Sequence, residues 1–258
     1  MSAGAAAAVG TAGNLGSTYY FANTFTSTAT TVLAYGRTSD EVFAGDWDGD
    51  GRDTLAIRRG NYFFLKNSLT GGTADLVFAY GRPGDQILVG DWSGTGRDSI
   101  ALRRGSTYYL LDCFHGGEAD HTVAYGRPGD SVVVGDWDGN GTDTLAVRRG
   151  ATYYVANAIH GGEADSVFVY GHASDQVLAG DWDGDGRDTL AVRRASTFYI
   201  NNRLSGGQAS TVVTYGRATD RVLVGDWDGD GRDTLGLRRP PAPVPTVKVP
   251  TVQTFNIA

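Results

Sequence analysis

The decapeptide GDWDGDGRDT occupies residues 45–54, and close copies of it begin at residues 90, 135, 180 and 225. Successive copies are therefore 45 residues apart. One copy could be a metal loop, a turn or an accident. Five copies at a fixed interval indicate a repeat architecture, and the sequence between them shows which one.

Each repeat contains four short runs rich in Val, Leu, Thr, Tyr and Phe. A run such as EVFAGDW enters the acidic loop and a run such as DTLAIRRG leaves it; an aromatic run, a Gly-Gly turn and a run ending in Tyr-Gly follow. Such runs, separated by turn residues, are typical of strands, and no helical period of comparable length is present. Four short strands in a unit of this length indicate a β-propeller blade.

The two ends of the repeat region complement each other. The region opens with a third and a fourth strand, STYYFANT from residue 17 and TTVLAYG from residue 30, and closes with a first and a second, RVLVGDW from residue 221 and DTLGLRR from residue 233. Joining them completes a blade and removes exposed sheet edges, whereas an open solenoid would need capping repeats. We therefore expect an all-β, five-bladed propeller of four-stranded antiparallel blades over residues 17–239, closed by pairing the terminal half-blades.

The segments outside the repeats and the composition limit the remaining possibilities. Residues 1–16 are expected to form a flexible tail, and the Pro-rich residues 240–258 a linker or tail. The first residues lack the basic region of a signal peptide, and no apolar stretch is long enough to span a bilayer. A net charge of -7 argues against a nucleic-acid partner, and a single cysteine, Cys113, excludes an internal disulfide.

The acidic loops have the residue types of a calcium site. Side chains at loop positions 1, 3 and 5 offer oxygen atoms, and a glycine at position 6 allows a sharp turn, which suits Ca²⁺. The lack of His and Cys beside the loop disfavours zinc and copper. The apolar residue at position 12 excludes an EF-hand. Three loops have all three carboxylates: Asp46, Asp48 and Asp50; Asp181, Asp183 and Asp185; Asp226, Asp228 and Asp230.

The other two loops are predicted to bind calcium less well. One carries Asp136, Asp138 and Asn140, in which an amide oxygen replaces a carboxylate, and we expect a weaker site. The second copy carries Asp91 with Ser93 and Thr95, and we expect it to be degenerate. The alternative for every loop is an Asp-Gly turn that joins two strands without a metal.

The D-x-D-x-D-G loop between two strands of a four-stranded repeat resembles the FG-GAP/VCBS repeats of integrin-like propellers over residues 17–240. This resemblance implies calcium at the edge of each blade. The family usually places a closing acid at loop position 9, where this chain has Thr or Ser. Position 8 is acidic instead, and it either closes the metal site or pairs with arginine. The position-8 candidates are Asp53, Asp143, Asp188 and Asp233.

Two further features recur in every repeat. A tryptophan follows the first loop aspartate and either packs between blades or offers a platform for sugar stacking: Trp47, Trp92, Trp137, Trp182 and Trp227. An Arg-Arg pair ends each second strand. We expect it to form bidentate pairs with loop aspartates or with Asp40, Asp85, Asp130, Asp175 and Asp220, and the alternative is a ring that binds anions.

We find no Ser/His/Asp order, phosphate loop or metal–histidine motif in the sequence. The expected function is a secreted, calcium-stabilised, non-enzymatic module that binds a glycan or cell-surface polymer at clefts between blades, where repeated weak sites give avidity. Five-bladed lectins resemble the chain in blade number and repeat length, and its repeats resemble those of bacterial secreted proteins. The alternatives are a protein-binding adhesion or structural module and, because some polysaccharide lyases use calcium-bearing propellers, a lyase or hydrolase.

Overall fold

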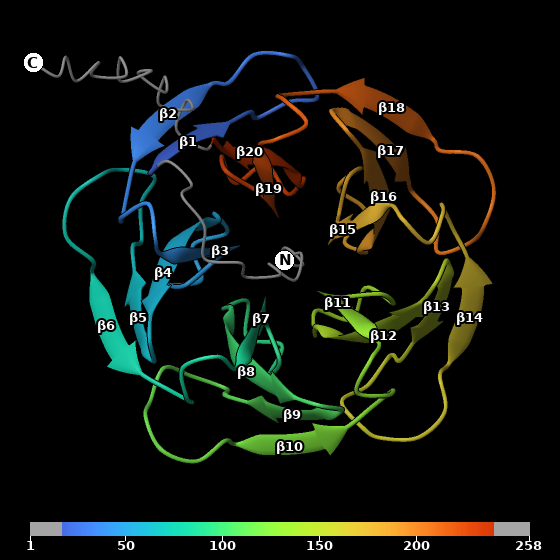
Figure 1. The fold of residues 1–258 in the computed structure, drawn as a ribbon, viewed down its shortest axis with the longest axis horizontal. Helices are drawn as coiled ribbons and strands as arrows, with labels where there is room; N and C mark the ends of the chain where they lie inside the picture. Colours follow the sequence, from blue (N-terminus) through green and yellow to red (C-terminus); the bar gives the residue numbers. More distant parts are fainter. Residues whose placement is uncertain (1–16, 240–258) are drawn as a thin grey trace, which may run out of the picture.

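The computed structural model describes residues 17–239, which form five four-stranded sheets arranged in a ring (Figure 1). Every pairing between neighbouring strands of a sheet is antiparallel. The predicted all-β, five-bladed propeller is therefore confirmed. The two predicted tails, residues 1–16 and 240–258, lie outside the described residues.

We number the blades in chain order, and within each blade the strands run from the axis outward. Blade 1 comprises β3 (Glu41–Gly45), β4 (Thr54–Arg59), β5 (Tyr62–Leu65) and β6 (Leu76–Ala79). Blade 2 comprises β7 (Gln86–Gly90), β8 (Ser99–Arg104), β9 (Thr107–Leu110) and β10 (His121–Ala124). Blade 3 comprises β11 (Ser131–Gly135), β12 (Thr144–Arg149), β13 (Thr152–Val155) and β14 (Ser166–Val169).

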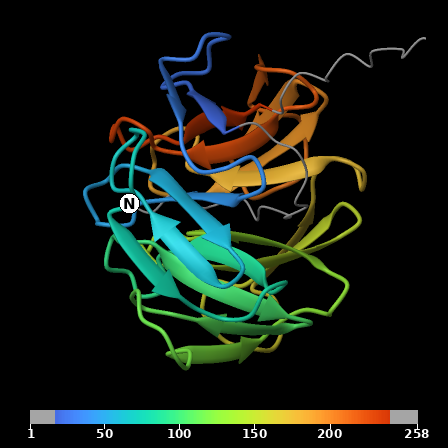
Figure 2. The ribbon, with the colours of Figure 1, turned by 60° about the vertical axis from the view of Figure 1, so that its left-hand side comes forward.

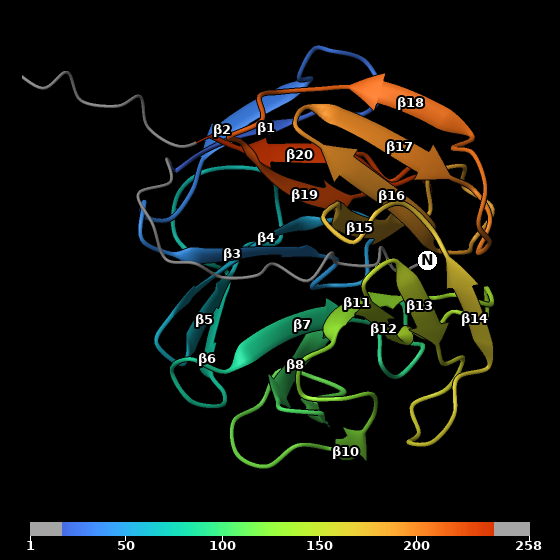
Figure 3. The same cartoon turned by 45° about the vertical axis from the view of Figure 1, so that its right-hand side comes forward.

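The last two blades complete the ring. Blade 4 comprises β15 (Gln176–Gly180), β16 (Thr189–Arg194), β17 (Thr197–Asn201) and β18 (Thr211–Thr214). Blade 5 comprises β19 (Arg221–Gly225), β20 (Thr234–Arg238), β1 (Thr18–Phe21) and β2 (Thr31–Ala34). The ribbon is shown turned to one side in Figure 2 and to the other in Figure 3, where β15, β16, β17 and β18 follow one another outward.

Blade 5 is built from both ends of the described chain. Its strand order is β19-β20-β1-β2, and β1 pairs with β20 so that Tyr19 lies opposite Arg238 and Phe21 opposite Gly236. Figure 1 shows β1 and β2, in blue, beside β19 and β20, in red. The predicted closure by two half-blades is thus confirmed, and no edge is left where the ring meets.

The hydrophobic core lies between adjacent blades. One cluster joins Phe43, Trp47 and Phe63 of blade 1 to Ile87 and Ile100 of blade 2. The second strand of each blade is buried along almost its whole length, because its two faces pack against the blades on either side. A blade therefore has no core of its own, and stability depends on contacts across the five interfaces.

Candidate metal loops and an inter-blade cavity

Each acidic loop folds around the carboxylate at its first position. In blade 1, the backbone amides of Gly49 and Asp50 donate to Asp46 Oδ1 over 2.7 and 3.2 Å, and the amide of Gly51 donates to Asp46 Oδ2 over 2.8 Å. Gly49 and Gly51 have φ values of +79° and +82°, which side chains other than glycine rarely adopt. The two glycines therefore allow the sharp turn that the sequence predicted.

Three loops bring their carboxylates close enough for a shared cation. In each of them the position-1, position-3 and position-5 aspartates offer oxygen atoms that lie within 4.8 Å of one another: Asp46, Asp48 and Asp50; Asp181, Asp183 and Asp185; Asp226, Asp228 and Asp230. Oxygen ligands about 2.3–2.6 Å from one calcium ion have comparable mutual separations. These three triads could hold metal ions, and hard oxygen donors suit a cation such as Ca²⁺.

The loop of blade 3 keeps the same turn with an amide at position 5. Asp136 accepts hydrogen bonds from the amides of Gly139 and Gly141 over 2.8 and 2.7 Å. Asn140 Oδ1 accepts from the amide of Thr142 over 2.8 Å, as Asp50 does from its own position-7 amide. The amide side chain therefore takes the same place in the turn, and weaker metal binding at this loop stays a prediction.

The loop of blade 2 has hydroxyl groups where the three triads have carboxylates. Ser93 Oγ lies 3.3 Å from Thr95 Oγ1 and 3.4 Å from Asp91 Oδ1, so the three side chains hydrogen-bond to one another. Two neutral hydroxyls offer a cation far less charge than two carboxylates do. The expected loss of metal binding at this loop also stays a prediction.

The position-8 aspartates contact the neighbouring blade. Asp53 Oδ2 accepts a hydrogen bond of 2.7 Å from the amide of Asp226, and the amide of Asp53 donates back to Asp226 O over 2.7 Å. Neither predicted role, closing its own metal loop or pairing with arginine, describes this contact. The same reciprocal pair recurs around the ring between Asp98 and Asp46, Asp143 and Asp91, Asp188 and Asp136, and Asp233 and Asp181.

These reciprocal pairs place negative charge inside the protein. Asp53 and Asp188 are 2% and 1% exposed, and Oδ1 of each lacks a hydrogen-bond partner. Burial, reinforced by the Asp98 carboxylate, raises the pKa of Asp53 well above its usual value, and burial with Asp143 does the same for the pKa of Asp188. Burial also raises the pKa of Asp46. A cation in the adjacent triad would favour the charged form of these carboxylates.

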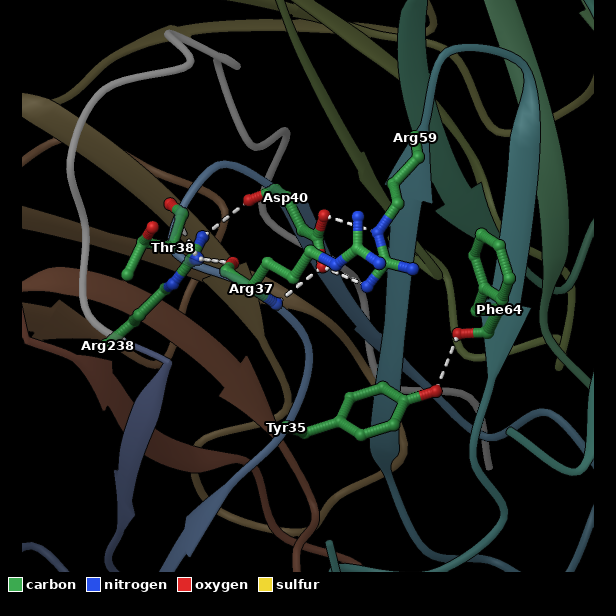
Figure 4. Close-up of polar contacts among 7 residues, drawn as sticks. All are labelled: Tyr35, Arg37, Thr38, Asp40, Arg59, Phe64 and Arg238. Carbon is green, nitrogen blue, oxygen red and sulfur yellow. Dashed lines mark hydrogen bonds and ion pairs between the residues drawn. The ribbon is translucent and has the colours of Figure 1, made fainter. Parts of the chain in front are cut away.

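The Arg-Arg pairs hold the turns between blades. Asp40, in the turn before β3, accepts from Arg59 Nε and Nη2 over 2.7 and 2.8 Å, which confirms the predicted bidentate pairing (Figure 4). Arg238 of blade 5 donates to the carbonyls of Asp40 and Arg37 in the same turn over 2.7 and 2.9 Å. One arginine of each pair therefore orders its own blade's entry turn, and the other binds the next blade's turn.

A tyrosine makes a third kind of link at each interface. Tyr35, directly after β2, donates its hydroxyl to the carbonyl of Phe64 in β5 over 3.1 Å (Figure 4). Tyr80, Tyr125, Tyr170 and Tyr215 repeat this contact around the ring. The acidic, basic and aromatic residues that recur in the sequence thus serve largely to join blades.

The five tryptophans belong to the core. Their exposed fractions are 3% for four of them and 4% for Trp227. Trp182 Nε1 donates to the carbonyl of Thr189 over 3.3 Å. Because no indole face is open to solvent, the packing interpretation fits the structure, and we do not carry the tryptophans forward as sugar-stacking residues.

A cavity opens on the face that carries the turns between fourth and first strands. It has a volume of about 410 Å³ and lies at blade 4, between the turn before β15 and the end of β16. Its lining includes His172, Ser174, Gln176, Arg193, Arg194 and Ala195. The sequence interpretation missed most of these residues. The signal that could have found them is departure from the repeat: His172 replaces an arginine found in the other four turns, and Ala195 replaces a glycine found in blades 1–3.

Comparison with known proteins adds no assignment. No protein-family model matches the chain, and no curated protein matches it significantly. Within residues 17–239 we find no helix with the length and hydropathy needed to cross a membrane. The described residues thus form a five-bladed β-propeller with three aspartate triads that could hold metal ions.

Proposed function

We propose that the protein is a secreted, calcium-stabilised propeller of the FG-GAP/VCBS type that acts as a non-enzymatic binding module. The observation that carries the metal part is the convergence of three carboxylates in each of three loops. Extracellular calcium-binding modules work at dissociation constants of roughly 10⁻⁴–10⁻³ M, which suits exposed loops of this kind. We assign no reaction to the protein.

We further propose that the ligand is a cell-wall glycan or another cell-surface polymer, and that bacterial surfaces are among those it binds. The cavity at blade 4 supports this, because its lining offers hydrogen-bond donors and acceptors from imidazole, hydroxyl, amide and guanidinium groups. Its volume of about 410 Å³ lies within the range of about 300–1,000 Å³ common for small-molecule sites. Related turns recur in every blade, so that several weak contacts with one polymer would add avidity.

A glycan array probed with the calcium-loaded protein and with the protein in a chelator tests this function. We expect retention of cell-surface glycans by the calcium-loaded protein, and weaker retention in the chelator if calcium orders the ring. The alanine variant Ser174→Ala, which alters the cavity lining, should bind less, whereas Ser93→Ala in the blade 2 loop should bind normally. Failure of the folded, calcium-loaded protein to retain any glycan would rule the proposal out.

Protein binding is the second candidate, and exposed apolar residues on the outer strands favour it. Val32 in β2, Val77 in β6 and Val212 in β18 are 56%, 49% and 58% exposed. These residues lie on the outer strands of blades 5, 1 and 4, which follow one another around the ring, so a protein partner that spans these blades would contact all three. A pull-down with the protein and with its Val32→Ser, Val77→Ser and Val212→Ser variants distinguishes this candidate, because glycan binding at the cavity would be unaffected by these changes.

A further inference from the structure

Arg193 brings an unbalanced positive charge to the cavity at blade 4. The side chain is 7% exposed, and it donates to Gln176 Oε1 over 3.1 Å and to the carbonyls of Asp220 and Arg217 over 2.9 and 2.8 Å. Its Nε has no partner. All these acceptors are neutral, and within the described part of the chain no carboxylate forms an ion pair with Arg193. A buried charge of this kind is costly unless an anion meets it.

Blade 1 shows the same position with its charge balanced. Glu41 lies opposite Arg58 in the β3–β4 ladder, just as Gln176 lies opposite Arg193 in the β15–β16 ladder. Glu41 Oε2 is 3.0 Å from Arg58 Nη1, so the buried guanidinium of blade 1 has a carboxylate partner. The facing residue carries no negative charge in blade 2 (Gln86), blade 3 (Ser131) or blade 4 (Gln176), and what sets blade 4 apart is that its buried arginine lines the cavity.

The other charged residues at the cavity balance each other. Arg194 donates from Nε and Nη2 to the two carboxylate oxygens of Asp175, both over 2.7 Å. This bidentate pair leaves Arg193 to set the charge of the site. His172, which stands where the other four turns have an arginine, and Ser174 line the cavity together with Arg193 and offer it an imidazole and a hydroxyl.

We propose that this cavity binds an acidic saccharide, with Arg193 meeting the carboxylate of a uronic acid unit and with His172 and Ser174 contacting its hydroxyls. The proposal rests on the glycan-binding function above and deepens it by naming the class of sugar and the blade. A carboxylate suits the site because hydrogen bonds from a guanidinium to an ionised oxygen are about twice as strong as those between neutral groups. The hydroxyl and imidazole groups beside it distinguish a sugar from a bare anion.

Isothermal titration of the calcium-loaded protein tests the assignment with two matched probes. One is an oligosaccharide that ends in glucuronic acid, and the other is the same oligosaccharide ending in glucose, so that the probes differ only by the carboxylate. We expect the acidic probe to bind at least about tenfold more tightly, the effect of one hydrogen bond to a charged group. A third titration, with inorganic phosphate, separates an acidic sugar from a free anion.

The variant Gln176→Glu is the informative change. It places a carboxylate beside Arg193 as in the Glu41–Arg58 pair, which the ring accommodates in blade 1, so the fold is expected to be kept. Affinity for the acidic probe should fall at least about tenfold, while affinity for the neutral probe stays the same. Gln86→Glu is the matched control, because Gln86 faces Arg103 in the same register of blade 2, and it should leave both affinities unchanged.

The outcomes separate the inference from the function on which it rests. Equal binding of the two probes, or an unchanged affinity in Gln176→Glu, overturns the acidic-saccharide site while leaving a glycan-binding module in place. Phosphate binding as tight as that of the acidic probe overturns the saccharide assignment in favour of a free anion. Lack of binding by both probes and by the glycan array removes the proposed function as well.

Discussion

Removing calcium should lower the unfolding temperature of the protein substantially. The reason lies in the three aspartate triads, where carboxylate oxygens lie within 4.8 Å of one another and repel each other when no cation is bound. A cation that binds these loops only in the folded state stabilises that state, since an unfolded loop does not hold its carboxylates together. The same cation offsets the buried charge on the adjacent position-8 aspartates.

The size of the effect follows from the number of triads. At a calcium concentration ten times the dissociation constant, each independent site adds about 1.4 kcal/mol to the free energy of unfolding. Three triads together would then contribute about 4 kcal/mol by the same relation. For a domain of this size, about 1 kcal/mol shifts the unfolding temperature by roughly 2–4 °C, so the three sites predict a shift of about 8–16 °C.

Thermal unfolding followed by circular dichroism in about 10 mM calcium and in excess chelator measures this shift, since that concentration is about ten times the weakest dissociation constant expected for extracellular modules. The variant Asp48→Asn with Asp50→Asn should lose about a third of the calcium-dependent shift. It should be at least as stable as the parent in chelator, because like charges have been removed.

Ser93→Ala with Thr95→Ala, in the blade 2 loop, is the matched control and should keep the whole shift. The reasoning fails if calcium leaves the unfolding temperature unchanged, or if the shift persists when Asp48, Asp183 and Asp228 are all changed to Asn.

Three further predictions concern the ring itself. Ala195 has φ +55°, so Ala195→Gly should stabilise the protein by about 1 kcal/mol. Gly150 has φ +63°, so Gly150→Ala should destabilise the protein by about the same amount. Urea unfolding measures both changes, and a change of the same sign in the two variants would contradict this reasoning. Asp188→Ala should lower the free energy of unfolding by about 1–3 kcal/mol, because it leaves the buried amide of Asp136 without its acceptor. Asp188→Asn keeps an acceptor oxygen and should lower it much less. Equal losses of stability in urea unfolding would argue against the inter-blade hydrogen bond. In chelator, stability should fall as pH rises above about 4, the ordinary pKa of an aspartate. The pKa values of Asp53, Asp188 and Asp233 are raised in the folded state, so that state holds protons that the unfolded state has lost. Their contribution to stability is therefore present at low pH and disappears as pH rises through the folded-state pKa. Unfolding temperatures measured across this range that rise with pH would refute the assignment.

The fold could be predicted because repetition supplies information that a single segment lacks. The unmatched half-units at residues 17 and 221 indicated ring closure, and β1 pairs with β20 as that argument requires. The aspartate triads were equally accessible, since their ligands lie within one turn of one loop. The Arg59–Asp40 pair was predictable too, because both residues recur at a fixed spacing in one blade.

Contacts between blades were harder to predict, because they depend on how the ring closes. Asp53 follows Asp46 closely in the chain, so the sequence interpretation offered it either a place in the same metal loop or an arginine partner. Its partner is instead Asp226, 173 residues away, on the neighbouring blade. The orientation of Trp47 was hard to predict for the same reason. Its side chain packs against blade 2, and the sequence around the loop gives no sign of that contact.

Residues repeated in all five blades and residues that depart from the repeat have different roles in this ring. The position-8 aspartates, the arginine pairs and the Tyr35-type hydroxyls recur because all five interfaces need the same links. Substituting any of them should therefore affect stability by a similar amount in each blade. A binding site that occurs once must instead use residues that differ between blades, and blade 4 combines such departures at His172 and Ala195 around one cavity. Weak contacts at equivalent turns can still add avidity, while the choice of an acidic sugar would depend on this blade, where the cavity is lined by Arg193, which faces Gln176 and not a carboxylate as Arg58 does.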